Sequence, residues 1–563
     1  MKKSFENYSK EELILEIEKL YKRKKYGLVW ETKNNEEVVE LCKKNIPILK
    51  EEKNREIIDK KNKNYGIFIE GDNFHSLAAL NYTHEKKIDF IYIDPPYNTG
   101  DDWKYNNNYV NKDDPFRHSQ WISFMYNRLK LAKSLLKEDG VICVTIDNNE
   151  LPRLWLLMDE IFKSKNFLGE VIIRNNPASR NVVGKIALTH EYALFFGKSS
   201  SSKISKIDKL ASEKSHKYIQ DNKGKWYSPT NLRKTGVDNF GIKKDGTLHH
   251  RHYPIYVDPK SKKISTSKKY KIKIFPINEK GEKVIWRRGK EDISKMFEDG
   301  LIFYNKTSSG DQIFYKHYGD LAEAPKSIWT DSKFSASEYG TPQLNDTLGK
   351  KSSFPFPKSP YAVEECIKIG CNKKNAIILD FFAGSGTTAQ AVINLNKKDN
   401  GSRSLIICTN NEKNIAKDDT YPRIKNLIKG YKSKKKEISG AEMNLKYFTT
   451  SFVERGETDK KKFSLAQNST DLICIKENSF KLEVANKDKY KIFSAGEKFT
   501  FILFDQSFID EIKKLIPKYK GYIKIYIFSL GNDSFQEEFE DFKNVETESF
   551  PDPIISVYNR LFN

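Results

Sequence analysis

The chain has 563 residues, with 98 lysines and arginines against 76 aspartates and glutamates, and a formal net charge of +22 at pH 7. This length predicts several domains, and the charge indicates a polyanionic partner such as nucleic acid, although a solvated, lysine-rich surface would give the same excess. The six cysteines form no Cys-x-x-Cys pair and no zinc pattern, which argues against a disulfide scaffold and a metal site. No apolar run has the length of a membrane span, so we expect a cytoplasmic protein with no membrane partner.

An N-terminal helical segment is expected over residues 1–65. Ser9 and Glu12 form a capping box ahead of apolar residues at helical spacing, which predicts a helix to about Tyr26. The apolar stripe is interpreted as core, with an oligomer surface as the alternative. A polar stretch rich in lysine and glutamate follows to about Lys63.

Residues 66–197 alternate short strands and helices, which is the pattern of a doubly wound α/β sheet. The expected strands are Gly66–Ile69, the run from Ile88 to Ile93, Val141–Ile146, Val171–Ile173 and Tyr192–Phe196. The expected helices are one ending near Tyr82, then Trp121–Leu136 and Leu154–Phe162.

The strand that starts at Ile88 ends at Asp94-Pro95-Pro96-Tyr97. Because neither proline has an N–H, the chain must turn into a stiff loop at the carboxyl end of the strand, where open α/β sheets bind ligands. The loop offers a carboxylate, backbone carbonyls and an aromatic ring, and this set can bind a planar group with an exocyclic amine. The alternative is a structural turn in which Tyr97 only covers the edge of the core.

The composition changes at about Lys198, where a serine-rich linker begins. Residues 201–300 contain 25 lysines and arginines against 12 aspartates and glutamates. Aromatic residues are interleaved among them: Trp226, Tyr227, His252, Tyr253, Tyr256, Tyr270, Phe275 and Trp286. This combination indicates a nucleic-acid surface, while a β-rich domain with an aromatic core would also explain it, and both can hold.

After residue 345 the alternation of strands and helices returns. A strand at Ala376–Leu379 leads into a glycine-rich turn over Asp380–Thr388 and a helix over Ala389–Leu395, a unit that lets a ligand approach the backbone near a helix N-terminus. Thr387 stands where a Walker loop has lysine, and the glycine spacing is not that of a dinucleotide motif, which disfavours an ATPase or a dehydrogenase. Glu412, after the next strand, is either placed for a ribose or is a surface acid.

The last segment, residues 451–563, carries no motif with recognisable chemistry. The expected strands are Leu472–Ile475, Phe499–Phe504 and Tyr522–Phe528, with a helix near Phe508–Leu515.

The two strand-end loops together resemble the β class of amino-methylating DNA methyltransferases. In that class Asp-Pro-Pro-Tyr is the catalytic loop, Phe-x-Gly-x-Gly is the cofactor loop, and a target-recognition domain separates them. Further motifs resemble the modification (Mod) subunits of Type III restriction–modification systems, namely Lys25–Glu31, Ile69–Asn73, Arg117–Trp121, Met158–Phe162 and Phe354–Lys358.

The resemblance implies a Rossmann-like, AdoMet-dependent methyltransferase fold with the catalytic half in residues 66–197, the target-recognition domain in 198–345, the cofactor half in 346–450, and a small C-terminal α+β domain in 451–563. It implies that the catalytic residues are Asp94, Pro95, Pro96 and Tyr97. It implies contacts to S-adenosylmethionine from Asp72, Asp94, Asp380, Phe382, Ala383, Gly384, Ser385, Gly386, Thr387 and Glu412. Phe381 stands where the family often has proline, and Glu412 is displaced from the family's acidic position, so its ribose role is the weakest of these expectations.

The reaction that the resemblance implies is methylation of the N6 amine of adenine in double-stranded DNA. If Asp94 and the Pro95 carbonyl accept the two amine hydrogens, the nitrogen lone pair is freed for attack, and Tyr97 stacks on the flipped base. In the family resembled, an acidic or amide residue at position 94 usually goes with adenine, and serine with cytosine. Methylation of cytosine N4, methylation of RNA and a non-catalytic recognition subunit remain alternatives.

The resemblance also implies a homodimer that methylates alone and cuts DNA only with a separate restriction subunit, a helicase–nuclease. No metal is implied.

Overall fold

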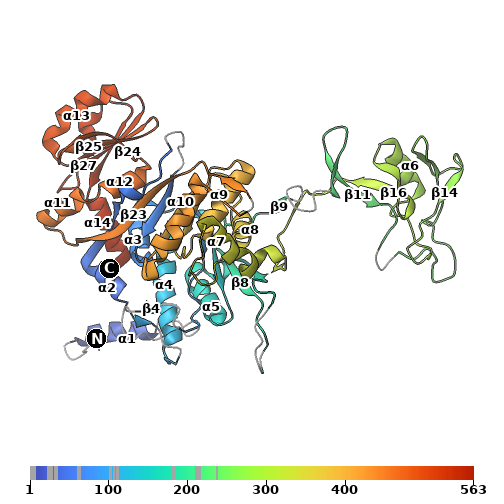
Figure 1. Ribbon diagram of the computed structural model, residues 1–563, viewed down its shortest axis with the longest axis horizontal. Coiled ribbons are helices and arrows are strands. Elements are labelled where there is room, and N and C mark those ends of the chain that lie inside the picture. Colours follow the sequence, from blue (N-terminus) through green and yellow to red (C-terminus); the bar gives the residue numbers. More distant parts are fainter. Residues whose placement is uncertain are drawn as a thin grey trace. The chain divides into compact units, whose positions relative to one another are not determined.

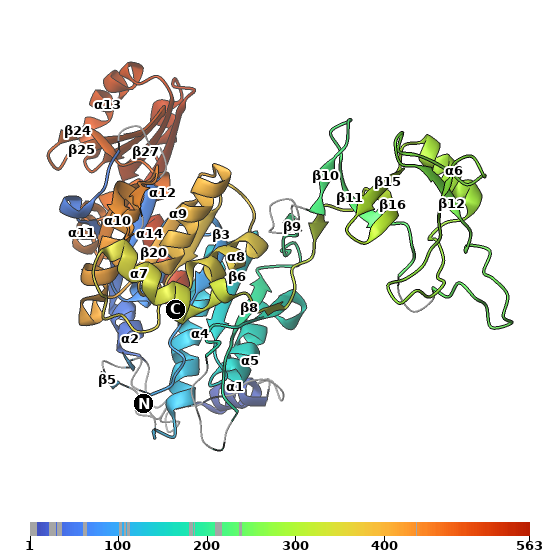
Figure 2. The ribbon, with the colours of Figure 1, turned by 45° about the vertical axis from the view of Figure 1, so that its right-hand side comes forward.

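The computed structural model describes residues 8–21, 30, 36–59, 65–100, 104–105, 108–109, 113–178, 184, 186–208, 217–235, 239–434 and 436–562 (Figures 1 and 2). The motif expected at Lys25–Glu31, except for Trp30, lies outside these residues, as does the predicted end of the first helix beyond Tyr21. The chain divides into two compact units, one formed by Met1–Ser205 with Lys326–Asn563 and the other by Lys206–Pro325. Within the described ranges, no helix combines the length and the apolar character needed to cross a membrane.

The larger unit is built on a ten-stranded sheet with the order β1-β23-β2-β20-β19-β3-β6-β8-β7-β18. The strands from β23 to β6 run parallel to one another, and β1 and β8 run antiparallel to their neighbours. In this order the bounds are Asn45–Glu51, Asn444–Glu454, Tyr65–Glu70, Ser404–Thr409, Ile377–Asp380, Ile88–Ile93, Leu136–Ile146, Glu191–Gly197, Phe167–Ile173 and Ile328–Trp329. The predicted doubly wound α/β fold is confirmed.

Helices cover both faces of this sheet, which is why the central strands read as continuous apolar runs. On one face, α3, α4 and α5 share the buried core that contains Ile91 and Ile93 of β3. On the other face α8 approaches β3 so closely that a Cβ on Gly370 would meet the ring of Phe90 at 2.0 Å. The bounds of the helices are α2 Glu37–Lys44, α3 Asn73–Thr83, α4 Arg117–Leu135, α5 Leu151–Phe162, α7 Thr341–Leu348, α8 Pro360–Gly370, α9 Thr387–Asp399 and α10 Tyr421–Lys429.

The first helix, α1 (Lys10–Tyr21), begins with the predicted capping box. The Ser9 amide donates to Glu12 Oε2 at 2.8 Å, and the Glu12 amide donates to Ser9 Oγ at 3.2 Å. The polar stretch behind it contains α2 and the edge strand β1, whose Ile46, Ile48 and Leu49 are buried in the main core.

The C-terminal segment forms a five-stranded sheet in the order β24-β25-β26-β27-β28, but it is not detached from the main core. Ile554, Ile555 and Tyr558 of α14 are buried in the main core, and the Tyr558 hydroxyl donates to the Pro47 carbonyl of β1 at 2.6 Å. The strand predicted at Leu472–Ile475 is wrong, because these residues lie in a buried helix, α12. The bounds are α11 Asp459–Gln467, α12 Thr470–Glu477, β24 Lys481–Asn486, β25 Tyr490–Ala495, β26 Lys498–Leu503, α13 Ile509–Leu515, β27 Tyr522–Phe528, β28 Val545–Phe550 and α14 Asp552–Phe562.

The smaller unit, Lys206–Pro325, has a four-stranded sheet in the order β10-β11-β16-β15, a three-stranded sheet in the order β13-β12-β14, and helix α6, which packs on β15 (Figure 2). Trp286, Tyr253 and Tyr304 are buried in its core, so part of the aromatic content is structural. The bounds are β9 Ile207–Asp208, β10 Ile219–Gln220, β11 Trp226–Asn231, β12 Ile255–Asp258, β13 Lys263–Ser265, β14 Ile272–Ile274, α6 Lys290–Glu298, β15 Ile302–Thr307, β16 Gly310–His317 and β17 Ala322–Glu323. Residues 198–205 and 326–345, which we expected in this insert, lie in the larger unit.

Candidate active site

The predicted site residues follow strands that end at one edge of the ten-stranded sheet. β2, β19, β3 and β6 are parallel members of this sheet, so Asp72, Asp380 and Asp94 come to the same edge. The antiparallel strand β8 begins at this edge, because Tyr192 pairs with Ile146 at the end of β6, and this places Glu191 there as well.

Asp94 is held by three side chains that reach the same carboxylate oxygen. The Tyr97 hydroxyl lies 2.7 Å from Asp94 Oδ1, the Thr145 hydroxyl donates to it at 2.8 Å, and Lys358 Nζ lies 3.3 Å away. The Asp94 side chain remains 28% exposed, so it can still meet a substrate group.

Lys358 is the centre of this arrangement. Its ammonium donates to the Tyr97 hydroxyl at 2.5 Å and forms an ion pair with Glu191, a buried carboxylate that also accepts a hydrogen bond from Asn175 Nδ2 at 2.7 Å. Burial lowers the pKa of Lys358, but the charges of Asp94 and Glu191 outweigh this effect and leave the pKa raised. Burial, and then the same two carboxylates, raise the pKa of Tyr97 well above 10. At neutral pH the group therefore contains a cationic lysine and a neutral phenol.

The proline loop itself is fixed from the protein side. Trp121 Nε1 donates to the Pro96 carbonyl at 2.7 Å, so this carbonyl already has a partner within the protein. The Pro95 carbonyl is the one that the sequence predicted to accept a hydrogen bond from the substrate amine. Asn98 adopts a left-handed conformation with φ 57°, and its Nδ2 donates to the buried Glu150 at 2.5 Å.

The glycine-rich loop between β19 and α9 has two left-handed residues, Gly384 at φ 47° and Gly386 at φ 80°. A Cβ would lie 3.0 Å from the Phe354 ring at Gly384 and 3.2 Å from Thr420 at Gly386, so a side chain at either position would be strained by the positive φ and would also press on its neighbour. The loop is thus a backbone cradle at the N-terminus of α9, which fits an adenosyl cofactor that must approach the backbone closely.

Arg423 of α10 holds this loop in place through hydrogen bonds. The guanidinium is fully buried and donates from Nη1 to the Ser385 carbonyl, to Ser385 Oγ at 3.1 Å and to Thr387 Oγ1 at 3.0 Å. Burial lowers the pKa of Arg423 to about 9. The positions of Ser385 and Thr387 are therefore set by a buried cation that the sequence did not reveal.

The remaining predicted cofactor residues surround the cradle. Asp380 is buried and accepts hydrogen bonds from Thr388 Oγ1 at 2.5 Å and from the Phe382 amide at 2.9 Å. Burial raises the pKa of Asp380 to about 7. Phe382 packs against Phe124 with ring centroids 5.8 Å apart, and Ala383 is buried.

Asp72 and Glu412 stand at two further positions around this edge. Asp72 caps α3 by accepting from the Phe74 amide at 2.7 Å, and Arg128 Nη2 lies 3.5 Å from it. Glu412 begins the short helix η6 (Glu412–Asn414) after β20 and is half-buried.

Around Asp94, sequence reasoning missed Thr145, Glu191 and Lys358, as it missed Arg423 at the glycine-rich loop. Lys358 ends the motif Phe354–Lys358, and Glu191 opens a strand, but no local pattern says that two charges so far apart in sequence will meet. Among the described residues, no group of three His, Cys, Asp or Glu side chains is arranged to hold a metal ion, and all six cysteines are buried thiols.

Comparison with known proteins gives this geometry its context. The DNA methylase family, of the N6/N4 type, matches residues 88–452. The chain is 31% identical over 461 residues to the Type III restriction-modification enzyme EcoPI Mod subunit of Escherichia phage P1, a match that covers 75% of this chain and 68% of that subunit. It is 34% identical over 352 residues to the Type II methyltransferase M.KpnI of Klebsiella pneumoniae, covering 61% of this chain and 80% of that enzyme.

A solved structure, the cytosine-N4-specific PvuII DNA methyltransferase, covers 64% of this chain and is itself covered over 86% of its length, at 14% identity and a TM-score of 0.34. The chain belongs to the DNA methylase family.

Proposed function

We propose that the protein transfers a methyl group from S-adenosylmethionine to the N6 amine of adenine in double-stranded DNA. The observation that carries this proposal is the cluster of Asp94, Tyr97 and Lys358 at the end of β3, beside the glycine cradle that follows the neighbouring strand β19. One loop suits an amine-bearing base and the other suits the cofactor, and the two strands are adjacent.

S-Adenosylmethionine is the methyl donor of this family, and when bound it supplies an electrophilic methyl group on a sulfonium. The fit to this chain is supported by the glycine cradle, whose two left-handed residues leave the backbone open to close approach, and by the helix N-terminus behind it. We assign its binding to Asp72, Asp94, Asp380, Phe382, Ala383, Gly384, Ser385, Gly386 and Thr387, with Glu412 as a candidate for the ribose.

The chain's own residues supply orientation and charge. In this proposal Asp94 and the Pro95 carbonyl accept the two hydrogens of the exocyclic amine, which frees the nitrogen lone pair. Lys358 and Thr145 keep Asp94 in one position, so the acceptor needs no rearrangement when the amine arrives. Tyr97, whose hydroxyl is tethered to Asp94, presents its ring to the base, which must leave the duplex to reach the site.

The target base that we propose is adenine rather than cytosine, because the residue at position 94 is an aspartate. The relatives named as Mod subunits support a role as the modification subunit of a Type III-like restriction–modification system. We propose that the protein acts as a homodimer in the cytoplasm and that its unit Lys206–Pro325 selects the DNA sequence. We also propose that DNA cleavage needs a separate restriction subunit.

Transfer of tritium from labelled S-adenosylmethionine tests the proposal. The wild-type chain should label duplex DNA and leave RNA unlabelled. D94A should abolish labelling, because it removes an amine acceptor, and should keep cofactor affinity within about three-fold, because it removes only one of the several assigned cofactor contacts and leaves the glycine cradle intact. A wild-type chain that labels no DNA, or D94A at the wild-type rate, would contradict the proposed function or the assigned acceptor, respectively.

A further inference from the structure

A second candidate site lies inside the unit Lys206–Pro325. It is a cavity of about 210 Å³, which we name the basic pocket, lined by Leu232, Lys234, Arg251, Arg287, Arg288, Met296 and Tyr315. Four of these residues are cations, and none is acidic. Like charges gathered around one cavity repel one another, and an anion placed among them converts the repulsion into attraction.

The cations are held by the backbone of the unit. The Lys234 amide donates to the Ile285 carbonyl at 2.9 Å, the Arg287 amide to the Leu232 carbonyl at 3.0 Å, and the Trp286 amide to the Arg251 carbonyl at 3.1 Å. Trp286 is buried between them, and its Nε1 donates to the Tyr253 carbonyl at 2.8 Å. The pocket is therefore preorganised, since its charged residues stand on segments that are bonded to one another.

One of the four cations of the pocket, Arg251, has a guanidinium N–H without a hydrogen-bond partner among the described residues. Its Nε is buried, and among the described residues no acceptor lies within hydrogen-bond distance of it. Arg287 differs, because its Nε donates to the Asn231 carbonyl at 3.1 Å and its Nη2 lies 3.3 Å from Thr235 Oγ1. Buried donors are normally paired, and this unpaired N–H belongs to one of the four cations that line the pocket, so an anion seated there would lie next to a guanidinium whose hydrogen bonds within the protein are incomplete.

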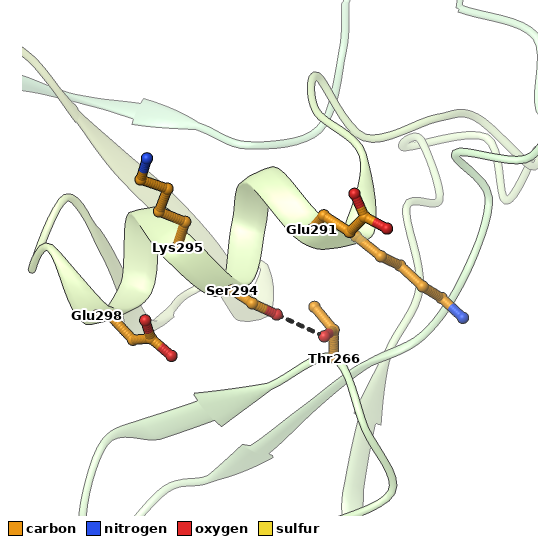
Figure 3. A pocket seen from close by; sticks show the side chains of 6 residues that line it. Thr266, Glu291, Ser294, Lys295 and Glu298 are labelled. Atoms are coloured by element: carbon orange, nitrogen blue, oxygen red, sulfur yellow. Dashed lines mark hydrogen bonds between the residues drawn. The ribbon is translucent and has the colours of Figure 1, made fainter.

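The neighbourhood of the pocket is electropositive. The pKa of His249 is lowered, first by burial and then by His250, Arg251, Lys243 and Lys234. A second cavity of this unit, shown in Figure 3, has a different lining. There Glu291 and Glu298 of α6 stand beside Lys290 and Lys295, and the hydroxyls of Thr266 and Ser294 bond to each other at 2.7 Å. The charged residues that line the basic pocket are thus all cations, whereas those of the second cavity have mixed charge.

We propose that the basic pocket binds a phosphate group of the DNA backbone, an inference that rests on the proposed function. Phosphate oxygens only accept hydrogen bonds, which matches a lining of guanidinium and ammonium donors. Phosphates also project from the duplex, whereas base edges lie at the floor of a groove and are read by elements that project into it. A concave pocket therefore suits the backbone better than a base edge.

The test compares R251M with K295M in the full chain. K295M is the matched control, because it removes one cation from the same unit but from the mixed-charge cavity. Fluorescence anisotropy with a mixed-sequence duplex should show that R251M weakens binding about ten-fold and lowers the slope of log Kd against log salt by about one, as expected for one lost phosphate contact. K295M should keep the wild-type slope, and R251K should recover most of it because the charge remains.

Single-molecule sequencing of methylated plasmid provides the second readout. R251M should methylate the same sequence motif as the wild type, since a phosphate contact carries no sequence information. R251M binding with the affinity and slope of K295M, or methylating a relaxed motif, would overturn the phosphate assignment. If R251M fails to fold, R288M, at an exposed lining position, decides by the same criteria. A wild-type chain that binds no DNA would refute the proposed function instead, so the two failures are distinguishable.

Discussion

The buried ammonium of Lys358 pairs with the carboxylates of Asp94 and Glu191 and donates a hydrogen bond to the Tyr97 hydroxyl, so it compensates the negative charge of the candidate active site. K358M should lower kcat by about 100-fold and reduce the free energy of unfolding by about 3–5 kcal/mol, since it leaves a buried carboxylate unpaired. K358R should restore part of the rate because it keeps the charge.

Steady-state kinetics and thermal denaturation measure both effects of the Lys358 substitutions. K333M, at a half-exposed lysine, is the matched control and should change neither quantity appreciably. A K358M enzyme with the wild-type kcat would show that the ammonium is not needed for the reaction.

Asp380 gives the fold a pH dependence with a definite sign. Its pKa is about 7 in the folded protein against the ordinary value of 3.8. Between these values the folded state binds the proton more tightly than the unfolded state does, so the free energy of unfolding should fall as the pH rises. This group contributes up to about 1.4 kcal/mol per pH unit between pH 4 and 7.

Denaturant unfolding at several pH values measures this contribution. The free energy of unfolding of D380N should vary less with pH between pH 4 and 7 than that of the wild type. D459N, at an exposed aspartate in the first turn of α11, should show the wild-type pH dependence. Parallel pH profiles for D380N and the wild type would contradict the role given to Asp380.

At the level of elements, the turn between β19 and α9 depends on glycine for two reasons. Gly386 is left-handed at φ 80° and also faces Thr420 at 3.2 Å, whereas Gly349 after α7 is left-handed at φ 69° with open space around it. G349A should cost about 1 kcal/mol of stability from the backbone alone, and G386A should cost about 1–3 kcal/mol.

G386A should also reduce the shift in melting temperature that S-adenosylmethionine causes, because the cradle it displaces is the proposed cofactor loop. G349A should keep the full shift. Differential scanning fluorimetry with and without the cofactor compares them, and an unchanged shift in G386A would remove this loop from the cofactor site.

The strand-end loops and the capping box could be predicted because each depends on a few adjacent residues. Other elements could not. β1 contains Pro47, which usually argues against a strand and is tolerated here because β1 lies at the sheet edge. The apolar run Leu472–Ile475 is buried on all sides, and in such a run a helix and a strand have the same pattern. Lys358 meets Tyr97 across 261 positions of sequence, a contact that only the sheet topology creates.

At the scale of the whole molecule, recognition and chemistry are expected to be separable. Replacing Lys206–Pro325 with the corresponding unit of a related enzyme should change the methylated motif and leave the modified base unchanged, since Asp94 and the glycine cradle lie in the other unit. Single-molecule sequencing of plasmid from cells that express the chimera measures this. An unchanged motif would assign recognition elsewhere in the chain.

The oligomeric state of the whole molecule and its proposed inability to cut DNA alone can both be tested. Light scattering of the purified chain should give the mass of a dimer, and incubation with unmodified DNA should leave the DNA uncut without a restriction subunit. A monomer at working concentrations would contradict the proposed homodimer, and cleavage by the chain alone would contradict the division of labour.

The atom that we propose to be methylated is the N6 nitrogen of adenine, and mass spectrometry of nucleosides identifies the modified base. Duplex DNA is incubated with the chain and S-adenosylmethionine, digested to nucleosides and compared with the product of D94A. The wild type should yield N6-methyldeoxyadenosine, and D94A should yield none. N4-methyldeoxycytidine in place of the adenine product would contradict the assignment, and the fold and the cofactor would stand.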